Sequence, residues 1–250
     1  MGQAHRDEVI IIAGNTLEVN EKMLEFTVLN MHDKPNKPKI KVYGFIDGFN
    51  LYHAIDRFDH GVGDADKARY QKYKWLCLTS LIKRFIAPET EELVGIEFFT
   101  AYPTWDAGKR MRHQVFVSAQ GTMGVHYTLG NFKNKTVTCR ADCKHDFTMH
   151  EEKQTDINIA VAMIDFADRY DKLILLTADS DQVPAVNLLK KLYPEKRIAV
   201  LPPIGRGAKE LSRACHETFK MTEDHLKDCQ LPNPIPIHKN AVLVKPPSWG

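Results

Sequence analysis

The sequence predicts an α/β protein with a central, mainly parallel sheet flanked by helices. From Lys41 onward, short apolar runs alternate with helical segments, which is typical of strand–helix–strand units. Two runs, VYGFIDGFN at 42–50 and LILLTADSD at 173–181, begin as buried parallel strands and end in carboxylates. Ligands of open α/β sheets collect at the carboxyl ends of the strands. The sequence therefore predicts a functional site where these two strands end.

The composition is that of a globular protein without a strong overall charge. The chain has 250 residues, 43% hydrophobic and 26% charged, and its formal net charge is +2. The net charge is too small to give an electrostatic field over the whole molecule that attracts nucleic acid. Binding of any polyanion would therefore require a local basic patch. No apolar run reaches the ~20 residues of a membrane helix and no signal peptide is evident, so we expect no membrane partner. Five cysteines, an odd number in a chain large enough to need no disulfides, favour a cytoplasmic location.

Three parts are expected along the chain. Residues 1–40 form an N-terminal extension, with a hairpin around Gly14 and Asn15 and a linker broken by prolines. Residues 41–231 form the α/β domain. Residues 232–250 form a C-terminal arm with too many prolines for a core element. Two alternatives stay open for this arm, which either docks on a neighbouring subunit of a homo-oligomer or is solvated.

In the first half of the domain, apolar runs predict the strands and three- and four-residue periodicity predicts the helices. We expect a strand at 40–46, helices at 50–58 and 68–85, a strand at 93–100, a helix at 107–119 and a strand at 124–129. The following segment, about 130–151, is polar and contains cysteines. It is therefore expected to be an extended excursion from the domain.

The second half continues the alternation. A helix is expected from Thr155 or Asp156, because apolar residues recur on one face up to Ala167 and either residue suits an N-cap near the positive end of the helix dipole. The later elements are expected as a strand at 172–177, a helix at 182–192, a strand at 197–201, a short helix at 208–214, a strand at Phe219 and a turn at 224–228.

Four aspartates are candidates for one metal site. Asp47, Asp179 and Asp181 follow strand ends, and Asp156 begins a helix that can face them. Clustered carboxylates raise one another's pKa unless a cation compensates, and carboxylate oxygens suit Mg²⁺ or Mn²⁺. Such an ion would support hydrolysis of a phosphodiester bond. Each aspartate taken singly is more typical of a turn or a helix cap, so the hypothesis depends on the joint pattern.

Three neighbouring side chains extend this hypothesis. Asn50 lies one turn after Asp47, and Ser180 lies between the two later aspartates. Either can hydrogen-bond an aspartate or orient a water molecule. Lys153 is placed to meet the charge of a phosphate.

Five motifs resemble, in order and spacing, those of the NYN domain family, which has a PIN-like nuclease fold. They are FIDGFNLYHA, GNFK with its two cysteines, EEKQTDINIAVAMIDFA, LILLTADSDQVPAV and LPP…ELSRAC. The resemblance covers roughly residues 41–232. It implies a three-layer PIN-like (Rossmann-like) fold and a Mg²⁺- or Mn²⁺-dependent ribonuclease, expected to be an endonuclease.

The resemblance also assigns the site residues. Asp47 and Asn50 match the aspartate and asparagine of the first motif, and Asp156 matches the acid of the EKxTD motif. Asp179 and Asp181 match the paired acids of the last strand motif. Ala178 replaces a glycine that is common in the family, a difference that leaves the ligands intact.

The excursion also offers a candidate zinc site. Cys139, Cys143, His145 and His150 have the spacing within each pair that structural zinc sites use. All four ligands would have to meet in one tight turn. We therefore favour a free thiol pair in a loop over a structural Zn²⁺ ion.

Candidate RNA contacts lie on the helix at 107–119 and after the strand at 124–129. Phosphate contacts supply affinity independent of sequence, and exposed aromatic rings stack on unpaired bases. The basic and histidine candidates are Lys109, Arg110, Arg112, His113, Lys133, Lys135 and Arg140, and the aromatic ones are Tyr102, Trp105, Tyr127 and Phe132. Each of them taken singly is more typical of a solvated helix face or of the core.

The sequence is thus compatible with three functions. The first is an endoribonuclease acting on single-stranded or structured RNA at the four aspartates. The second is a catalytically silent module that binds RNA or protein, which the complete set of acids argues against. The third is a Toprim-like phosphotransfer enzyme, because Asp179-Ser180-Asp181 is an acid-x-acid motif after a strand, although the motif at Asp47 fits that class poorly.

Overall fold

The computed structural model describes residues 38–56, 70–139, 144–238 and 241–249. The hairpin expected around Gly14 and Asn15 lies outside these ranges. No helix in the described ranges is long and apolar enough to cross a membrane.

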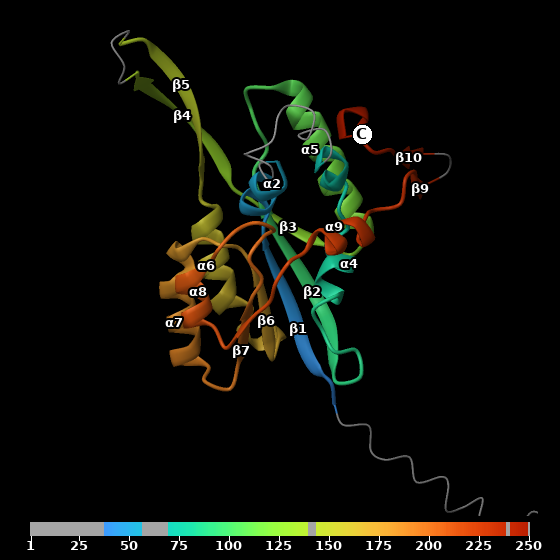
Figure 1. Ribbon diagram of the computed structural model, residues 1–250, viewed down its shortest axis with the longest axis vertical. Coiled ribbons are helices and arrows are strands. Elements are labelled where there is room, and N and C mark those ends of the chain that lie inside the picture. Colours follow the sequence, from blue (N-terminus) through green and yellow to red (C-terminus); the bar gives the residue numbers. More distant parts are fainter. Residues whose placement is uncertain (1–37, 57–69, 140–143, 239–240, 250) are drawn as a thin grey trace, which may run out of the picture. The chain divides into compact units, whose positions relative to one another are not determined.

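A six-stranded parallel sheet forms the centre of the domain (Figure 1). The strand order is β3-β2-β1-β6-β7-β8, and every neighbouring pair is parallel. The strands are β1 (Ile40–Asp47), β2 (Glu91–Thr100), β3 (His126–Leu129), β6 (Lys172–Leu176), β7 (Arg197–Val200) and β8 (Glu217–Thr218). The central strands are apolar on both sides because helices cover both faces. The expected strands, including the short one beside Phe219, are present with small shifts at their ends.

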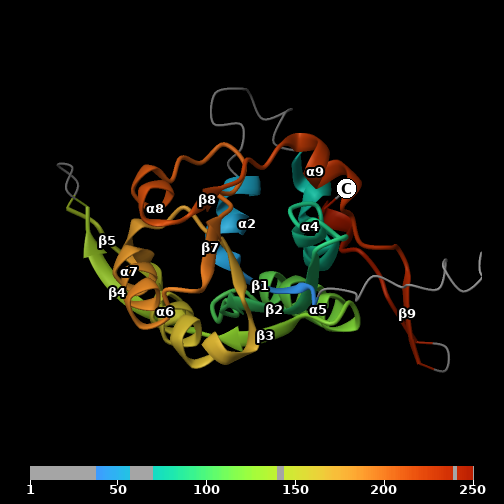
Figure 2. The ribbon, with the colours of Figure 1, turned by 90° about the horizontal axis from the view of Figure 1, so that it is seen from below.

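Helices cover the two faces of this sheet in separate layers (Figure 2). On one face lie α2 (Gly48–Asp56), α4 (Leu78–Lys83), α5 (Ala107–Thr122) and α9 (Glu223–Asp228), and on the other lie α6 (Thr155–Asp165), α7 (Val183–Leu192) and α8 (Lys209–Ala214). Each layer packs its own hydrophobic core, one around Trp75 and Phe98 and the other around Phe45 and Met163. The predicted three-layer α/β fold is therefore confirmed.

The single long helix expected at 68–85 is wrong. Within the described part of that range, a 3₁₀ turn, η1 (Lys72–Lys74), is separated from α4 by an extended stretch. The backbone N–H of Cys77 donates to the carbonyl of Cys229 at 2.6 Å, and Leu76 forms a β-bridge with Gln230. The Cys77 sulfur then accepts from the Ser80 N–H at the start of α4. Contacts with the distant C-terminal segment thus override the helical periodicity.

The segment at 130–151 forms an antiparallel hairpin that projects from the body of the domain (Figure 1). Its strands are β4 (Asn131–Thr138) and β5 (Asp146–Lys153), paired from Asn131 opposite Lys153 to Thr138 opposite Asp146. The hairpin returns directly into α6. The hairpin and the start of α6, which contains Asp156, therefore form one continuous segment.

The C-terminal segment takes part in the core, contrary to the expectation of an arm outside it. It contains β9 (Ile235–His238), β10 (Ala241–Leu243) and a 3₁₀ turn, η4 (Pro247–Trp249). Ile235 and Trp249 are buried, and the Trp249 ring lies 6.3 Å from the Trp75 ring and 6.0 Å from the Phe116 ring. The prolines prevent a regular central strand but leave these large apolar side chains free to pack.

Candidate active site

The site begins where β1 and β6 end side by side. Ile46 pairs with Leu176 in the sheet, so the next residues, Asp47 and Thr177, are neighbours across the strands. The Thr177 hydroxyl donates to Asp47 Oδ2 at 2.8 Å, and the backbone N–H of Asn50 donates to Asp47 Oδ1 at 2.9 Å. Asp47 is only 4% exposed. Both oxygens of a buried carboxylate are thus fixed in orientation.

Gly48 allows α2 to begin directly after Asp47. A Cβ atom at this position would lie 2.5 Å from the Phe98 ring and 2.7 Å from the carbonyl oxygen of Phe99. Since β2 passes so close, only glycine fits without moving the strand. Close packing against β2 therefore explains the glycine of the Asp-Gly pair, and the chemistry of the site explains the aspartate.

The turn after β6 presents the next two aspartates. The Asn50 side-chain oxygen accepts from the Ala178 N–H at 3.2 Å, which ties α2 to this turn. The N–H of Asp179 donates to Thr177 Oγ1 at 3.1 Å, and Asp179 Oδ1 accepts from the Asp181 N–H at 2.9 Å. Asn50 thus holds the turn through its side chain. Asp181 is exposed and Asp179 partly so.

Glu152 approaches the site from β5 of the hairpin, and Asp156 approaches it from the start of α6. Gln154 occupies the N-cap position with a left-handed φ of 78°, so Thr155 and Asp156, expected as caps, lie in the first helical turn. The Thr155 hydroxyl donates to Glu152 Oε1. A non-glycine residue at positive φ carries strain of about 1–3 kcal/mol, a feature that clusters at functional sites. This strained turn places the carboxylate of Glu152 on one side of Gln154 and the carboxylate of Asp156 on the other.

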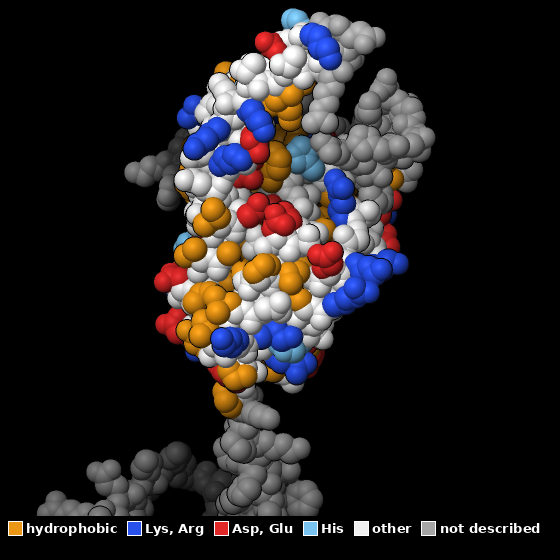
Figure 3. Space-filling model, turned by 90° about the vertical axis from the view of Figure 1, so that its left-hand side faces the viewer, with side chains coloured by type: hydrophobic (Ala, Val, Ile, Leu, Met, Phe, Trp, Pro, Cys, Tyr) orange, Lys and Arg blue, Asp and Glu red, His pale blue; other side chains and the backbone are white. Residues whose placement is uncertain are grey.

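Electrostatic coupling shows that these carboxylates form one group. Burial, together with the charges of Asp156 and Glu152, raises the pKa of Asp47 to about 6 although the hydrogen bonds from Asn50 and Thr177 lower it. Burial also raises the pKa of Asp156, with Asp179 and Asp181 adding to the shift. The pKa of Glu152 is raised by burial and by Asp156. We call Asp47, Glu152, Asp156, Asp179 and Asp181 the acidic cluster. Acidic side chains gather in the middle of the face in Figure 3, next to a hollow lined by hydrophobic and histidine side chains.

The donor chemistry of the acidic cluster fits a hydrated divalent ion. Across the described residues, no three His, Cys, Asp or Glu side chains are placed to hold a metal ion directly. Mg²⁺ keeps several water ligands and is bound through one or two carboxylates, so it does not need three such side chains in direct contact. Gln182 Nε2 donates to the Asp156 carbonyl oxygen at 3.1 Å, and its buried Oε1 has no hydrogen-bond partner. That oxygen is an available acceptor for a metal-bound water.

The basic residues predicted to bind substrate are spread over different surfaces. Arg112 on α5 lines a cavity next to Gly48, whereas Arg110 on the same helix is exposed and does not line it. Side chains alternate along a strand, so Lys133 and Lys153 lie on the opposite face of the hairpin from Glu152. There Lys153 pairs with Glu151 at 2.7 Å. Ser180 is exposed in the turn between Asp179 and Asp181.

The four proposed zinc ligands do not come together. Cys143 lies outside the described residues. His150 pairs with Asn134, five residues along β4 from Cys139, a separation of about 17 Å at the usual rise per residue. Zinc ligands lie about 2.0–2.3 Å from the ion, so a site that includes both Cys139 and His150 is wrong. His145 is exposed, with its carbonyl oxygen accepting from the Cys139 N–H at 2.8 Å.

Thr177 and Gln182 are two site residues that the sequence did not predict. Thr177 is a polar residue at the end of an apolar run, which is a weak signal for a partner to Asp47. Gln182 follows Asp181 and is 1% exposed, although polar residues in such turns are usually solvated. Only the tertiary arrangement shows that these side chains hold the acidic cluster.

The parallel sheet, the helices on both faces and the acidic carboxyl ends of β1 and β6 define an α/β protein of the PIN-like class. The sequence profile of the NYN domain matches residues 41–222, and the chain belongs to the NYN domain family. Members of this family are generally nucleases, which supports a nuclease-like function. The Toprim-like alternative is set aside by this membership.

One solved structure similar to this chain is that of a protein of unknown function from Vibrio parahaemolyticus. The two sequences are 17% identical, and the superposition covers 75% of this chain and 96% of the other with a TM-score of 0.47. No curated protein matches the chain.

Proposed function

We propose that the protein is a divalent-metal-dependent endoribonuclease that hydrolyses phosphodiester bonds of RNA at the acidic cluster. The observation that carries this proposal is the electrostatic coupling of five carboxylates, from three separate segments, beside the ends of two parallel strands. Carboxylates gathered in this way are stabilised by a cation. In the NYN family, a nuclease is the function that such a site supports.

Each residue has a distinct part in the proposed reaction. Asp47, Asp156, Asp179 and Asp181 would hold Mg²⁺ or Mn²⁺, one or two of them directly and the others through bound water, and the ion would polarise the phosphoryl oxygen and lower the pKa of a water. Thr177 and Asn50 keep Asp47 and the turn after β6 in place. The Gln182 oxygen is positioned to accept a hydrogen bond from water near Asp156.

A cytoplasmic location is part of the same proposal. Cys77, Cys139, Cys215 and Cys229 are free thiols. Free thiols are typical of proteins in a reducing compartment, where RNA is also available.

One set of reactions tests this function. Labelled single-stranded RNA, double-stranded RNA and single-stranded DNA are incubated with the wild type, with Asp179→Asn and with the exposed control Asp168→Asn, in Mn²⁺ or EDTA. We expect internal cleavage of RNA in Mn²⁺ by the wild type and the control, and loss of cleavage with Asp179→Asn or EDTA. The proposal fails if the wild type cuts nothing, or if Asp179→Asn and EDTA leave cutting unchanged.

A second candidate is a silent module that binds RNA without cutting it, and it is favoured by the finding that no three His, Cys, Asp or Glu side chains among the described residues are placed to hold a metal ion directly. Binding of RNA in a filter or anisotropy assay without Mn²⁺-dependent cleavage would be its result.

A further inference from the structure

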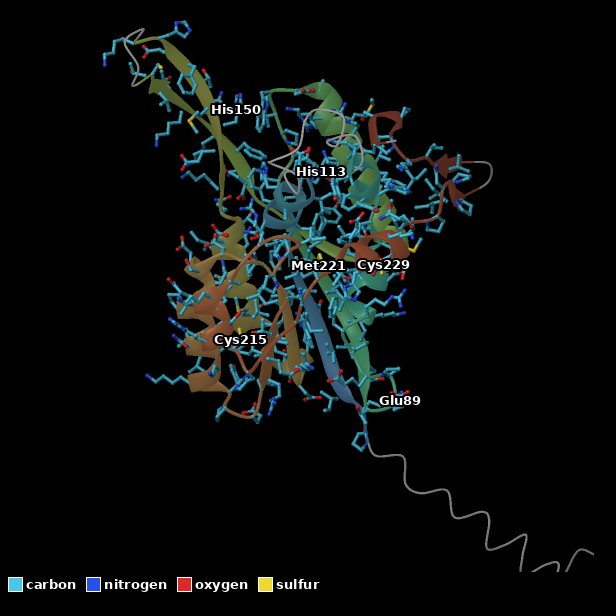
Figure 4. The ribbon with its side chains drawn as sticks, in the orientation of Figure 1. Glu89, His113, His150, Cys215, Met221 and Cys229 are labelled. Atoms are coloured by element: carbon cyan, nitrogen blue, oxygen red, sulfur yellow. The ribbon has the colours of Figure 1, made fainter. Side chains whose placement is uncertain are left out.

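A cavity of about 700 Å³ lies directly beside the acidic cluster. It is lined by side chains of α2, of the loop between β2 and α5, of α5 itself, of the hairpin and of η4. Figure 4 labels His150 on its hairpin side and His113 on its α5 side. We call this cavity the aromatic groove. Its walls come from segments distant in sequence, so it is a product of the fold.

A continuous row of rings forms one side of the aromatic groove. The row runs from Phe49 to Phe132 at 5.7 Å between ring centroids, and from Phe132 to Trp105 at 4.6 Å. Trp105 then stacks on His150 at 3.9 Å with an interplanar angle of 1°. Neither hydrophobic core includes Phe49, Phe132 or Trp105, and 40% of the Trp105 surface is exposed. Core packing therefore does not explain this row.

Cationic side chains line the same groove. Lys109 and Arg112 lie three residues apart on α5, so they share one side of the helix. Asp106 lies close to both and partly offsets their charge. Lys74, also in the lining, pairs with Asp56 at 2.5 Å. Lys109 and Arg112 can thus contact phosphate groups while the rings contact bases.

The aromatic groove and the acidic cluster lie next to each other. Gly48 and Phe49, in the lining, directly follow Asp47. Phe132 pairs with Glu152 across the hairpin, so the two side chains lie on the same face. A strand with one phosphate at the acidic cluster therefore has its neighbouring bases within reach of the rings.

We propose that the aromatic groove binds unpaired bases of single-stranded nucleic acid, with Trp105, Phe132 and Phe49 as the stacking surfaces. Bases in a duplex stack on one another and do not offer their faces to side chains, whereas splayed bases do. The inference rests on the proposed nuclease function and specifies its substrate as single-stranded. It explains why rings with exposed surface gather beside carboxylates.

Binding of a fluorescein-labelled single-stranded RNA oligonucleotide, followed by anisotropy in Mn²⁺, tests this inference. All proteins carry Asp179→Asn so that the oligonucleotide is not consumed. Trp105→Leu removes the exposed ring and keeps an apolar side chain, and Trp105→Tyr keeps a ring. Phe147→Leu is the matched control, because Phe147 is an exposed ring on the same hairpin outside the groove. A second series of oligonucleotides carries one abasic position at successive places.

We expect about ten-fold weaker binding with Trp105→Leu, near-normal binding with Trp105→Tyr and Phe147→Leu, and weaker binding of duplex competitor. One abasic position should weaken binding to the parent protein, with a smaller effect in Trp105→Leu. If the oligonucleotide binds but Trp105→Leu matches Phe147→Leu and no abasic position matters, the groove inference fails while the nuclease proposal stands. Preference for duplex overturns the inference in the same way. If no nucleic acid binds and the wild type cuts none, both proposals fail.

Discussion

The acidic cluster and the aromatic groove are neighbours, but they are held in different ways. Asp47 is 4% exposed, and hydrogen bonds from Thr177 and Asn50 fix both of its oxygens. Trp105 is 40% exposed and packs against the rings of Phe132 and His150. Groups that bind a metal require fixed positions, whereas surfaces that stack on bases require accessible area. Substitutions in the acidic cluster should therefore abolish the chemistry, whereas substitutions in the aromatic groove should weaken substrate binding.

The largest effect is expected at the acidic cluster. Asp47→Asn removes a charge and nearly preserves shape, so the fold should persist. Cleavage in Mn²⁺ should fall by about a thousand-fold, because metal stabilisation of the transition state contributes several kcal/mol. Initial rates and circular dichroism measure the two quantities. An Asp47→Asn enzyme of wild-type rate would remove this residue from the site.

A stability effect is expected at the glycine beside that carboxylate. Gly48→Ala places a methyl group against Phe98 and the Phe99 carbonyl, and overpacking of this kind lowers the free energy of unfolding by about 1–3 kcal/mol. The control is Gly121→Ala in α5, where a Cβ meets nothing within 4 Å. That change should stabilise by about 0.5–1 kcal/mol. Urea denaturation compares the two, and equal midpoints would show that β2 can move aside.

A smaller effect, confined to binding, is expected in the aromatic groove. Trp105→Leu should raise KM about ten-fold for single-stranded RNA with kcat nearly unchanged, since the ring contacts bases away from the bond that is cut. Steady-state kinetics separates the two constants. A fall in kcat with KM unchanged would instead assign Trp105 to the chemical step.

The smallest effect concerns pH and His113, which borders the groove. Burial lowers the pKa of this half-buried histidine to about 4, and its Nε2 lies 2.7 Å from Thr100 Oγ1. The unfolded chain takes up the proton near pH 6.5, so stability present above that pH is lost as pH falls toward 4. Since the ring is partly solvated, we expect a loss of about 1 kcal/mol at pH 5 relative to pH 7. His113→Gln should reduce this slope and the exposed His145→Gln should not; identical slopes for all three proteins would refute the shift.

The parts of the molecule that were predictable from sequence are those set by local pattern and parallel topology. Apolar runs predicted β1 and β6, and adjacent parallel strands end at the same edge, which brings Asp47 and Asp179 together. Asp156 was expected to face them from a helix start, and its coupling to Asp179 agrees.

The parts that were not predictable depend on contacts between distant segments. The helix expected at 68–85 is interrupted by backbone bonds with Cys229 and Gln230. Trp249 packs on Trp75 although its segment is rich in proline. The partnership of Thr177 with Asp47 depends on the register of two strands. Such pairings follow from the tertiary structure, and local propensity carries no signal for them.

A pair of substitutions on α6 tests most directly that the coupled carboxylates are a metal-dependent nuclease site. Asp156 lies in the first turn and Asp165 is exposed at the other end of the same helix, about 13 Å away at 1.5 Å per residue. The cleavage rate of single-stranded RNA is measured across a Mn²⁺ titration for Asp156→Asn and Asp165→Asn. We expect loss of metal-dependent cleavage for Asp156→Asn and the wild-type curve for Asp165→Asn. Wild-type curves for both variants, or cleavage independent of Mn²⁺, would show that the acidic cluster is not a metal-dependent nuclease site.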